Sequence, residues 1–520
     1  MFRVFPAGKT LVHKERSLFL RKFNDNQRCL FSSSGDDSVI RCVIVGSGPA
    51  GFYTAKYLLE KTSRITVDIL DCLPTPYGLV RQGVAPDHQE VKSVMATFND
   101  VAKSNRFRFF GNVSVGSIND VSVKNQVTIP ELKNAYDVVV LAYGASSDKG
   151  LNIPGEQLNG VISARSFVNW YNGHPNYKHI GKSFDLKKIK RVVVIGQGNV
   201  AIDCARVLLK STEELEKTDI SAHALQALKE SSVEEVIIIG RRGHIQASFT
   251  IKEIRELTKL DDVSVNILQS ELDASLTEVS KLELQNSRPK HRIVELINKI
   301  ASDTTARGST DTNRKKIDFR FLLSPETILA SSDDETGVAS LTLAKNVLTV
   351  DGNKQKATAT KDKETIKCEL ILKSVGYKSE SMSGVPFDVI TNVVPNIKGR
   401  VISHTDQNMG SVHFDDSLYV CGWLKRGPSG IIGTNITDAK ETVDSILEDT
   451  ALKKAYSKCD PLLNIPALNS PTVISWEDYL RIEQEEELRG ITSNPPKPRE
   501  KICDVAELLK VAKTDWANMS

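Results

Sequence analysis

The sequence predicts an α/β protein with two parallel-sheet domains, one of them inserted in the other. The chain has 520 residues, more than one hydrophobic core usually organises. Residues 39–71 and 191–243 each contain an apolar strand, a glycine-rich turn, a helix with apolar periodicity and a returning strand. Two further apolar strands, 136–141 and 370–374, flank the second of these units. We therefore expect the second domain to interrupt the first.

The first unit has the spacing of a nucleotide-binding turn. Residues 46–51 have the sequence G-S-G-P-A-G, and Asp71 follows the returning strand. In such a unit Gly46 permits the tight turn, Gly48 lets the backbone approach a pyrophosphate, and Gly51 lets helix and strand pack closely. Asp71 stands where a carboxylate accepts hydrogen bonds from ribose hydroxyls. This predicts a Rossmann-like dinucleotide site, with packing glycines and an acidic turn residue as the alternative.

The second unit carries the opposite charge at the matching place. Residues 196–201 have the sequence G-Q-G-N-V-A, so Ala201 replaces the third glycine, which the pattern tolerates. The returning strand 236–239 leads to Arg241 and Arg242, where an NAD enzyme would place an acid. Two guanidinium groups can bind a 2′-phosphate that a carboxylate would repel. The second unit therefore predicts NADPH, and the free ribose hydroxyls of FAD match Asp71; an exposed basic turn is the alternative for the arginines.

A late segment has features of a flavin contact. Strand 418–423 runs into a glycine-rich stretch, 427–433, and a helix is expected over 435–447. Glycines at a helix start let backbone amides approach the flavin ring, and the positive helix end stabilises negative charge on the reduced ring. Trp423 either stacks near the flavin or nicotinamide or serves as a packing aromatic.

Two ionisable side chains, His88 and Asp203, are the candidates for catalytic contacts beside the cofactors. Asp203 lies in the apolar helix of the second unit, where a charged group needs a partner, so we predict that it pairs with His88. Hydride transfer between a nicotinamide and a flavin requires positioning rather than an acid–base residue.

The predicted division of the chain has four parts. Residues 1–34 form a targeting segment, 35–145 the first part of an FAD-binding domain, 146–371 an NADP-binding domain, and 372–520 the second part of the FAD-binding domain with a C-terminal extension. The polar stretches 302–316 and 351–364 are expected to be exposed loops of the inserted domain.

Cysteine spacing and hydropathy exclude several classes of protein. The eight cysteines, at positions 29, 42, 72, 204, 368, 421, 459 and 503, include no Cys-x-x-Cys pair. This argues against a disulfide framework, a zinc site or an iron–sulfur cluster on this chain, so redox chemistry must come from an organic cofactor. No apolar run approaches the roughly 20 residues of a transmembrane helix.

The first 30 residues differ in charge from the remainder. Basic residues outnumber acidic ones seven to two among residues 1–28, with apolar residues interspersed. This pattern is typical of a mitochondrial transit peptide, with cleavage near Arg28, and a disordered basic tail is the alternative. The whole chain has a net charge of +3, and without this segment it is about −2. Net charge therefore gives no support for nucleic-acid binding, and an acidic partner must meet a local basic patch.

Several segments together resemble the NADPH:adrenodoxin (ferredoxin) oxidoreductase family of mitochondria, over residue 39 to the C-terminus. They are residues 46–55, 76–90 (P-Y-G-L-V-R-Q-G-V-A-P-D-H-Q-E), 196–206, 240–257 and 422–434. The resemblance implies an enzyme of the mitochondrial matrix or the matrix face of the inner membrane, and it leaves peripheral membrane association open. It also implies that electrons pass singly from reduced FAD to a [2Fe-2S] ferredoxin, which serves cytochrome monooxygenases and iron–sulfur cluster assembly.

The resemblance also implies contact residues. FAD contacts are implied at Ala50, Asp71, Leu79, Val115, Trp423, Gly430, Ile431 and Ile432. NADPH contacts are implied at Gln197, Gly198, Asn199, Val200, Arg241, Arg242, Glu253 and Gly430. Basic positions that match the family and could meet the ferredoxin are Lys252, Arg255, Arg288, Lys290 and Arg292, a set that we call the basic patch. A merely solvated charged face is the alternative for the basic patch.

Three other functions compete with this interpretation. The NADPH–flavin subunit of glutamate synthase relays electrons through cysteine-bound clusters, and pyridine-nucleotide disulfide reductases use a cysteine pair, so cysteine spacing disfavours both. A flavin-binding scaffold without turnover is the third, and the presence of Arg241 and Arg242 argues against it.

Overall fold

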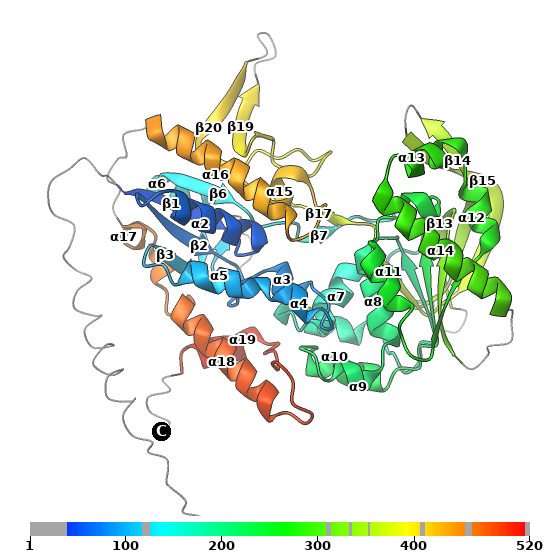
Figure 1. Cartoon of the computed structure of the whole chain (residues 1–520). Helices are drawn as coiled ribbons and strands as arrows, with labels where there is room; N and C mark the ends of the chain where they lie inside the picture. Colours follow the sequence, from blue (N-terminus) through cyan, green and yellow to red (C-terminus); the bar gives the residue numbers. More distant parts are fainter. Residues whose placement is uncertain are drawn as a thin grey trace, which may run out of the picture.

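The computed structural model describes residues 39–116, 125–307, 314–331, 335–351, 354–405, 411–452 and 460–514. The predicted targeting segment, 1–34, lies outside these residues. Figure 1 shows two domains side by side, joined by the short strands β7 (Ser147–Asp148) and β17 (Tyr377–Lys378). β7 and β17 pair antiparallel, so the chain leaves the first domain and returns to it at one place.

The first domain contains a seven-stranded sheet in the order β18-β19-β20-β6-β1-β2-β3. The five strands from β20 to β3 are parallel, and β18 and β19 add an antiparallel edge. The strands are β1 (Ile40–Val45), β2 (Ile65–Leu70), β3 (Phe107–Phe110), β6 (Val138–Leu141), β18 (Asn396–Ile397), β19 (Arg400–Thr405) and β20 (Val412–Val420). Because β1, β2, β3 and β6 precede the second domain and β18, β19 and β20 follow it, both ends of the chain build this sheet.

Helices cover both faces of the first sheet. Side chains of β1 alternate between two cores: Cys42 and Ile44 face one, and Val43 and Val45 the other. The helices of this domain are α2 (Pro49–Lys61), α3 (Leu79–Gln82), α4 (Gln89–Lys92), α5 (Val94–Ala102), α6 (Ile129–Ala135), α15 (Trp423–Arg426), α16 (Thr434–Leu452), α17 (Pro461–Asn464), α18 (Trp476–Thr492) and α19 (Val505–Ala512). A small pair, β4 (Ser114–Val115) and β5 (Gln126–Val127), lies beside the sheet.

The second domain contains a six-stranded parallel sheet in the order β11-β12-β10-β9-β16-β8. Its strands are β8 (Val161–Ser163), β9 (Arg191–Ile195), β10 (Glu235–Ile239), β11 (Val263–Ile267), β12 (Lys315–Arg320) and β16 (Leu370–Lys373). Its helices are α7 (Ala164–Tyr171), α8 (Asn199–Leu209), α9 (Thr212–Leu215), α10 (Ala222–Lys229), α11 (Ile251–Leu257), α12 (Gln269–Ser275), α13 (Glu278–Gln285) and α14 (Arg288–Arg307). The predicted α/β fold, with one nucleotide-binding domain inserted in the other, is confirmed.

The other face of the six-stranded sheet is covered by an antiparallel sheet instead of helices. It consists of β13 (Leu323–Ala330), β14 (Val338–Asp351) and β15 (Lys354–Lys367). Leu341, Leu343 and Ile366 of these strands pack against Val193 and Ile195 of β9. The prediction of loops was therefore wrong for residues 302–307, in α14, and 354–364, in β15, although most of these residues are exposed as predicted. Residues 308–313 and 352–353 lie outside the described residues. A strand with one solvated face is rich in polar residues, which made residues 354–364 resemble a loop.

The predicted limit of the inserted segment after residue 371 falls inside β16. All of β16 pairs with β9 and β8 of the second sheet. A short apolar strand does not indicate which of two sheets it joins, and this ambiguity displaced the limit by a few residues. Among the described residues, no helix is both long and apolar enough to cross a lipid bilayer.

Candidate functional site

The turn between β1 and α2 is built for close approach of backbone. Gly46 has φ +108°, and a Cβ there would lie 2.6 Å from the Ala142 carbonyl oxygen. A Cβ on Gly51 would lie 2.1 Å from the Gly46 carbonyl oxygen. By contrast, a Cβ on Gly48 would have no atom within 4 Å. Gly46 and Gly51 are therefore required by the fold itself, whereas the space at Gly48 is open to a ligand.

Asp71 lies at the end of β2 and is held against this turn. Its Oδ2 accepts hydrogen bonds from the Ser47 amide at 2.9 Å and the Ser47 hydroxyl at 2.5 Å, and its Oδ1 accepts one from the Leu73 amide at 2.9 Å. Burial raises the pKa of Asp71, although these hydrogen bonds oppose the shift. The carboxylate is thus fixed in position, with Oδ2 accepting two hydrogen bonds and Oδ1 one from the backbone.

The other predicted flavin contacts surround the same turn. The segment before Leu79 approaches it, because the Tyr77 amide donates to the Ser47 carbonyl at 3.0 Å. Ala50 faces the start of α15, where a Cβ on Gly422 would be 2.5 Å from the Ala50 Cβ. Val115 lies on β4 two residues after Val113, whose amide donates to the Asp71 carbonyl at 2.9 Å.

Trp423 lies between the interdomain link and the glycine-rich stretch before α16. Its ring centroid is 5.3 Å from that of Tyr377, and its Nε1 donates to the Ser429 carbonyl at 3.2 Å. Gly430, Ile431 and Ile432 follow directly, and 67% of the Ile431 surface is exposed. The Ile431 side chain is therefore not packed in the core of the protein.

The turn between β9 and α8 repeats the first arrangement. Gly196 has φ +130°, and a Cβ there would lie 2.1 Å from the Ser374 carbonyl oxygen, whereas a Cβ on Gly198 would have no atom within 4 Å. The Gln197 side-chain amide donates to the Arg320 carbonyl at 3.1 Å, and Asn199 Oδ1 accepts from the Thr250 amide at 2.9 Å. Val200, in the first turn of α8, is half-buried.

Arg241 and Arg242 follow β10 at the edge of this turn. Arg241 is exposed and Arg242 is half-buried. Within the part of the chain that the structure describes, neither side chain forms a hydrogen bond or a salt bridge. Their backbone is held instead, because the Arg241 carbonyl accepts from Asn346 Nδ2 at 2.8 Å and the Arg242 carbonyl from the Leu322 amide at 3.2 Å. A positioned backbone with two unpaired guanidinium groups fits a ligand phosphate.

Both nucleotide helices begin without a side-chain cap. The N-caps of α2 and α8 are Gly48 and Gly198, and neither amide end receives a side-chain hydrogen bond. Thr250, Ser475 and Asp504, in contrast, cap α11, α18 and α19. Free amides, the positive helix end and an open glycine Cβ position are what a pyrophosphate requires. The residues present therefore fit two dinucleotides.

A cluster of ionisable side chains joins the two domains beside these turns. His88 Nε2 lies 2.6 Å from Glu256 Oε2 and 4.0 Å from Glu253 Oε2. Asp203 Oδ1 instead accepts from Arg206 Nη2 at 2.7 Å. The predicted direct pair of His88 with Asp203 does not form: Asp203 pairs with Arg206, one helical turn away on its own helix, and His88 acts on it only through its charge.

Arg206, which sequence reasoning missed, is the centre of this cluster. Its guanidinium group donates to both oxygens of Asp87, at 2.8 and 3.1 Å, and to Glu253 Oε2 at 3.2 Å. Its side chain is only 2% exposed. The sequence signal was an arginine on the apolar face of a helix, three residues after an acid.

His88, Glu253 and Glu256 also have a spacing that a metal ion could use. Their ligand atoms all lie within 4.8 Å of one another. However, Arg206 Nη1 is 3.2 Å from Glu253 and 3.6 Å from Glu256, and Lys252 Nζ is 3.7 Å from Glu256. These cations already supply positive charge to the carboxylates.

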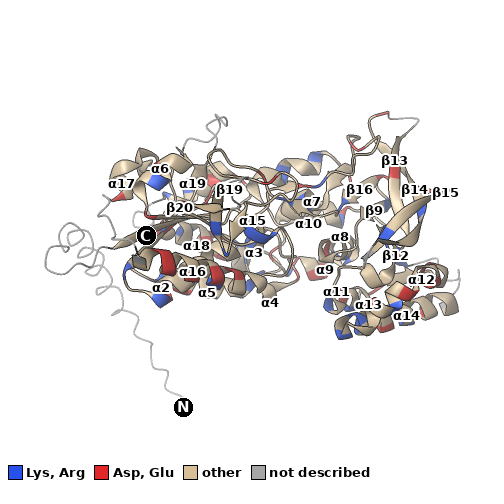
Figure 2. Ribbon diagram, turned by 90° about the horizontal axis from the view of Figure 1, so that it is seen from above, with Lys and Arg blue, Asp and Glu red and all other residues tan. Residues whose placement is uncertain are grey.

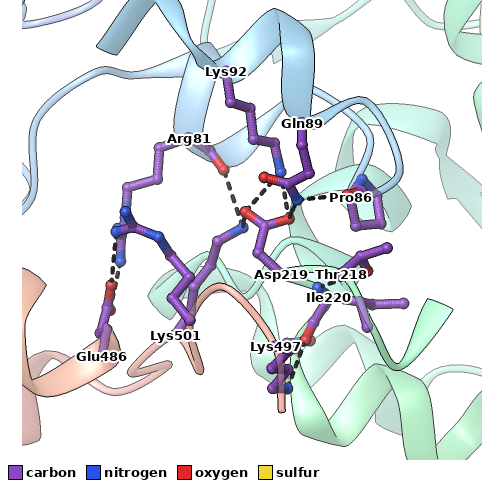
Figure 3. A network of polar contacts seen from close by, with 12 residues as sticks. Arg81, Pro86, Gln89, Lys92, Thr218, Asp219, Ile220, Glu486, Lys497 and Lys501 are labelled. Atoms are coloured by element: carbon purple, nitrogen blue, oxygen red, sulfur yellow. Dashed lines mark hydrogen bonds and ion pairs between the residues drawn. The ribbon is translucent and has the colours of Figure 1, made fainter. Parts of the chain in front are cut away.

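A second buried network ties the C-terminal segment to both domains (Figure 3). Lys92 Nζ lies 2.5 and 2.7 Å from the oxygens of Asp219, and Lys501 Nζ lies 3.0 Å from Asp219 Oδ2. Beside it, Arg81 Nη2 donates to Glu486 Oε1 at 2.6 Å. One carboxylate cannot neutralise two ammonium groups, so burial and the charge of Lys501 lower the pKa of Lys92 to about 7.

The basic patch lies on α11 and the start of α14, which contact each other (Figure 2). Lys252, Arg255, Arg288 and Arg292 are exposed, and Lys290 is half-buried. Lys252 pairs with Glu90 at 2.5 Å, and Lys290 pairs with Glu283. The predicted residues thus lie on two adjacent helices, and two of them, Lys252 and Lys290, already have acidic partners.

Comparisons with known proteins agree with this geometry. A family model described as pyridine nucleotide-disulphide oxidoreductase matches residues 40–281. NADPH:adrenodoxin oxidoreductase of Arabidopsis thaliana mitochondria is 44% identical over 93% of this chain and 97% of its own length. The human mitochondrial protein of the same name is 39% identical over 90% of this chain and 91% of its own. The chain belongs to the NADPH:adrenodoxin oxidoreductase family.

A solved structure of this family supports the fold assignment. The structure described as Mycobacterium tuberculosis FprA in complex with NADPH superposes with a TM-score of 0.80 at 38% identity, and the match covers 92% of this chain and all of the other. Family membership and the two nucleotide turns make the chain an oxidoreductase with FAD and NADP(H) as cofactors. The six described cysteines are free, so no disulfide among them takes part.

Proposed function

We propose that this chain takes hydride from NADPH and passes electrons singly to a mitochondrial [2Fe-2S] ferredoxin. The observation that carries the proposal is the opposite charge at the ends of β2 and β10: Asp71 in the first domain, and Arg241 with Arg242 in the second. The names of the relatives, NADPH:adrenodoxin oxidoreductase and NADPH-ferredoxin reductase, support the same donor and class of acceptor. FAD, when bound, accepts two electrons as hydride and releases them one at a time.

The first domain holds the flavin cofactor in this proposal. Asp71 accepts hydrogen bonds from the ribose hydroxyls, and the free amides of α2 receive the pyrophosphate beside Gly48. Ala50, Leu79, Val115, Trp423 and residues 430–432 surround the ring system and its chain.

The second domain holds the nicotinamide nucleotide. The amides beside Gly198 receive the pyrophosphate, and Gln197, Asn199 and Val200 line the turn. Arg241 and Arg242 would bind the 2′-phosphate, and a nucleotide that lacks this phosphate gains neither contact. Glu253, Asp203 and His88, at the junction of the domains, would contact the nicotinamide part of the nucleotide.

The basic patch is the proposed ferredoxin surface. Arg255, Arg288 and Arg292 are exposed and form no salt bridge within the described chain, so they are available to an acidic partner. A basic surface of this kind accelerates encounter with an acidic protein at low ionic strength. We place the enzyme in the mitochondrial matrix or on the matrix face of the inner membrane, with residues 1–34 as its transit peptide.

The test is reduction of cytochrome c by NADPH, using purified residues 35–520 with and without a [2Fe-2S] ferredoxin. We expect a protein with a flavin spectrum and a rate that depends on the ferredoxin. A flavin spectrum with a rate that does not depend on ferredoxin would support the cofactors but contradict ferredoxin as the electron acceptor. Absence of flavin would remove the proposal altogether.

A further inference from the structure

The cluster around Arg206 combines acids from both domains around one cation. Asp87 comes from the loop before α4 of the first domain, whereas Asp203 on α8 and Glu253 on α11 belong to the second. The Arg206 guanidinium lies within 3.2 Å of all three carboxylates. It is nearly inaccessible to water and thus pays a desolvation penalty that only close carboxylates offset.

We propose that Arg206 is a positioning residue that holds the Asp203 and Glu253 carboxylates ionised and in place against the nicotinamide. This inference rests on the proposed function, which puts both acids at the nicotinamide. Loss of a hydride, one proton with two electrons, leaves the nicotinamide ring with one positive charge. An ionised carboxylate stabilises that charge, and a protonated one does not.

The environment of the two acids shows why a cation is needed. Burial raises the pKa of Asp203, and Arg206 is the largest influence that lowers it. Burial also raises the pKa of Glu253, Asp203 raises it further, and His88 and Arg206 oppose both effects. Among the described residues, the ionisable groups facing these acids are Asp87, His88, Tyr171, Cys204, Arg206, Lys252, Glu256 and Tyr377. Without Arg206, Asp203 would be buried beside Asp87 with His88 as its nearest remaining cationic neighbour, and Glu253 would keep only His88 and the exposed Lys252 as described neighbours that favour its ionisation.

The fork geometry explains why an arginine serves here. Nε and Nη2 bind the two oxygens of Asp87, which leaves Nη2 also in contact with Asp203 and directs Nη1 to Glu253. A lysine carries the same charge but has no planar fork, so it could not orient three carboxylates at once. Two substitutions can therefore separate the two roles of Arg206: Arg206→Met removes the charge and the planar fork, whereas Arg206→Lys keeps the charge and removes only the fork.

The experiment measures NADP⁺ affinity by calorimetry from pH 6 to 9 in wild type, Arg206→Met and Arg206→Lys. NADP⁺ affinity should fall as the pH is lowered and the two acids are protonated. In Arg206→Met, the pH midpoint of this loss should lie about one unit or more higher than in wild type, which is the usual effect of removing an opposite charge at this distance. Arg206→Lys should shift this midpoint much less while still weakening NADP⁺ binding. Arg206→Lys also serves if the methionine variant does not fold.

Arg400→Met is the matched control. Arg400 also binds several acids, Glu448 and Asp449 among them, but lies on β19 in the first domain. It should leave the pH midpoint of NADP⁺ affinity unchanged. An unmoved midpoint in Arg206→Met, with affinity reduced equally at every pH, would mean that Arg206 is only structural. If wild type itself does not bind NADP⁺, the proposed function is contradicted. This result differs from an unmoved pH midpoint in Arg206→Met, which would contradict only the role of Arg206.

Discussion

The two nucleotide turns share a backbone design but differ in how their selective charges are held. Asp71 is tied by hydrogen bonds to Ser47 and Leu73, and the segment before Leu79 and the start of α15 approach its turn. Arg241 and Arg242 lie at the surface with unpaired side chains. A site whose polar groups are already held in place suits a cofactor that stays bound, and exposed, unpaired side chains suit a substrate that enters and leaves at every turnover. With FAD at the first turn and NADPH at the second, as proposed, the contrast predicts that FAD is retained and NADPH exchanges.

The largest effect is expected from removing the two arginines at the second turn. Arg241→Ala with Arg242→Ala removes two charge-assisted hydrogen-bonding groups, each worth about 1.5–3 kcal/mol. kcat/KM for NADPH should fall on the order of 100-fold or more, while kcat/KM for NADH stays unchanged. Steady-state kinetics with both nucleotides checks this, and Lys188→Ala, at a position where 83% of the side chain is exposed, is the control. An unchanged preference for NADPH would contradict the assignment of the 2′-phosphate.

The two turns also differ at the third position of the glycine pattern, which is Gly51 in the first turn and Ala201 in the second. Gly51→Ala would put a methyl group 2.1 Å from the Gly46 carbonyl oxygen, so backbone must move. We expect a loss of about 1–3 kcal/mol in the free energy of unfolding and a lower ratio of flavin to protein. Ala201→Gly at the matching position should cost less than about 1 kcal/mol. Denaturant unfolding and the visible spectrum measure both; equal effects at the two positions would contradict the argument.

The basic patch gives a smaller, salt-dependent effect. Arg288→Glu with Arg292→Glu should slow ferredoxin reduction about 10-fold at low salt, and the difference from wild type should shrink as salt increases. Flavin reduction by NADPH should not change. Lys103→Glu with Lys188→Glu changes the net charge equally elsewhere on the surface and controls for long-range effects. If Arg288→Glu with Arg292→Glu reduced ferredoxin at the wild-type rate at low salt, the basic patch would not be the ferredoxin surface.

The smallest effect concerns the network at the C-terminal segment. Lys92 has a pKa of about 7 in the folded chain, against an ordinary value near 10.5. Between these values the unfolded chain binds a proton that folded Lys92 does not, so this group makes stability rise with pH. The stability of wild type relative to Lys92→Met should therefore increase from pH 7 to pH 9. Thermal melts measure the difference, and a constant gap, like that expected for Lys188→Met, would contradict the shift.

The features that were predictable from sequence are local ones. The turns at 46–51 and 196–201, their flanking strands and the Arg241–Arg242 pair depend on residues close together in the chain. Arg206, Asp219 and Lys501 have partners up to hundreds of positions away, and no periodicity links Lys92 to Asp219 or Arg206 to Asp87. The His88–Asp203 pair failed for the same reason, because each charge had several possible partners and only the fold decides between them.

The central question is which nicotinamide nucleotide delivers hydride to the bound flavin. The direct measurement is anaerobic stopped-flow bleaching of the flavin absorption by NADPH and by NADH, in wild type without any electron acceptor. We predict that one equivalent of NADPH bleaches the flavin fully and that NADH does so far more slowly. Equal rates with the two nucleotides, or a purified protein without flavin, would contradict the assignment of the two turns.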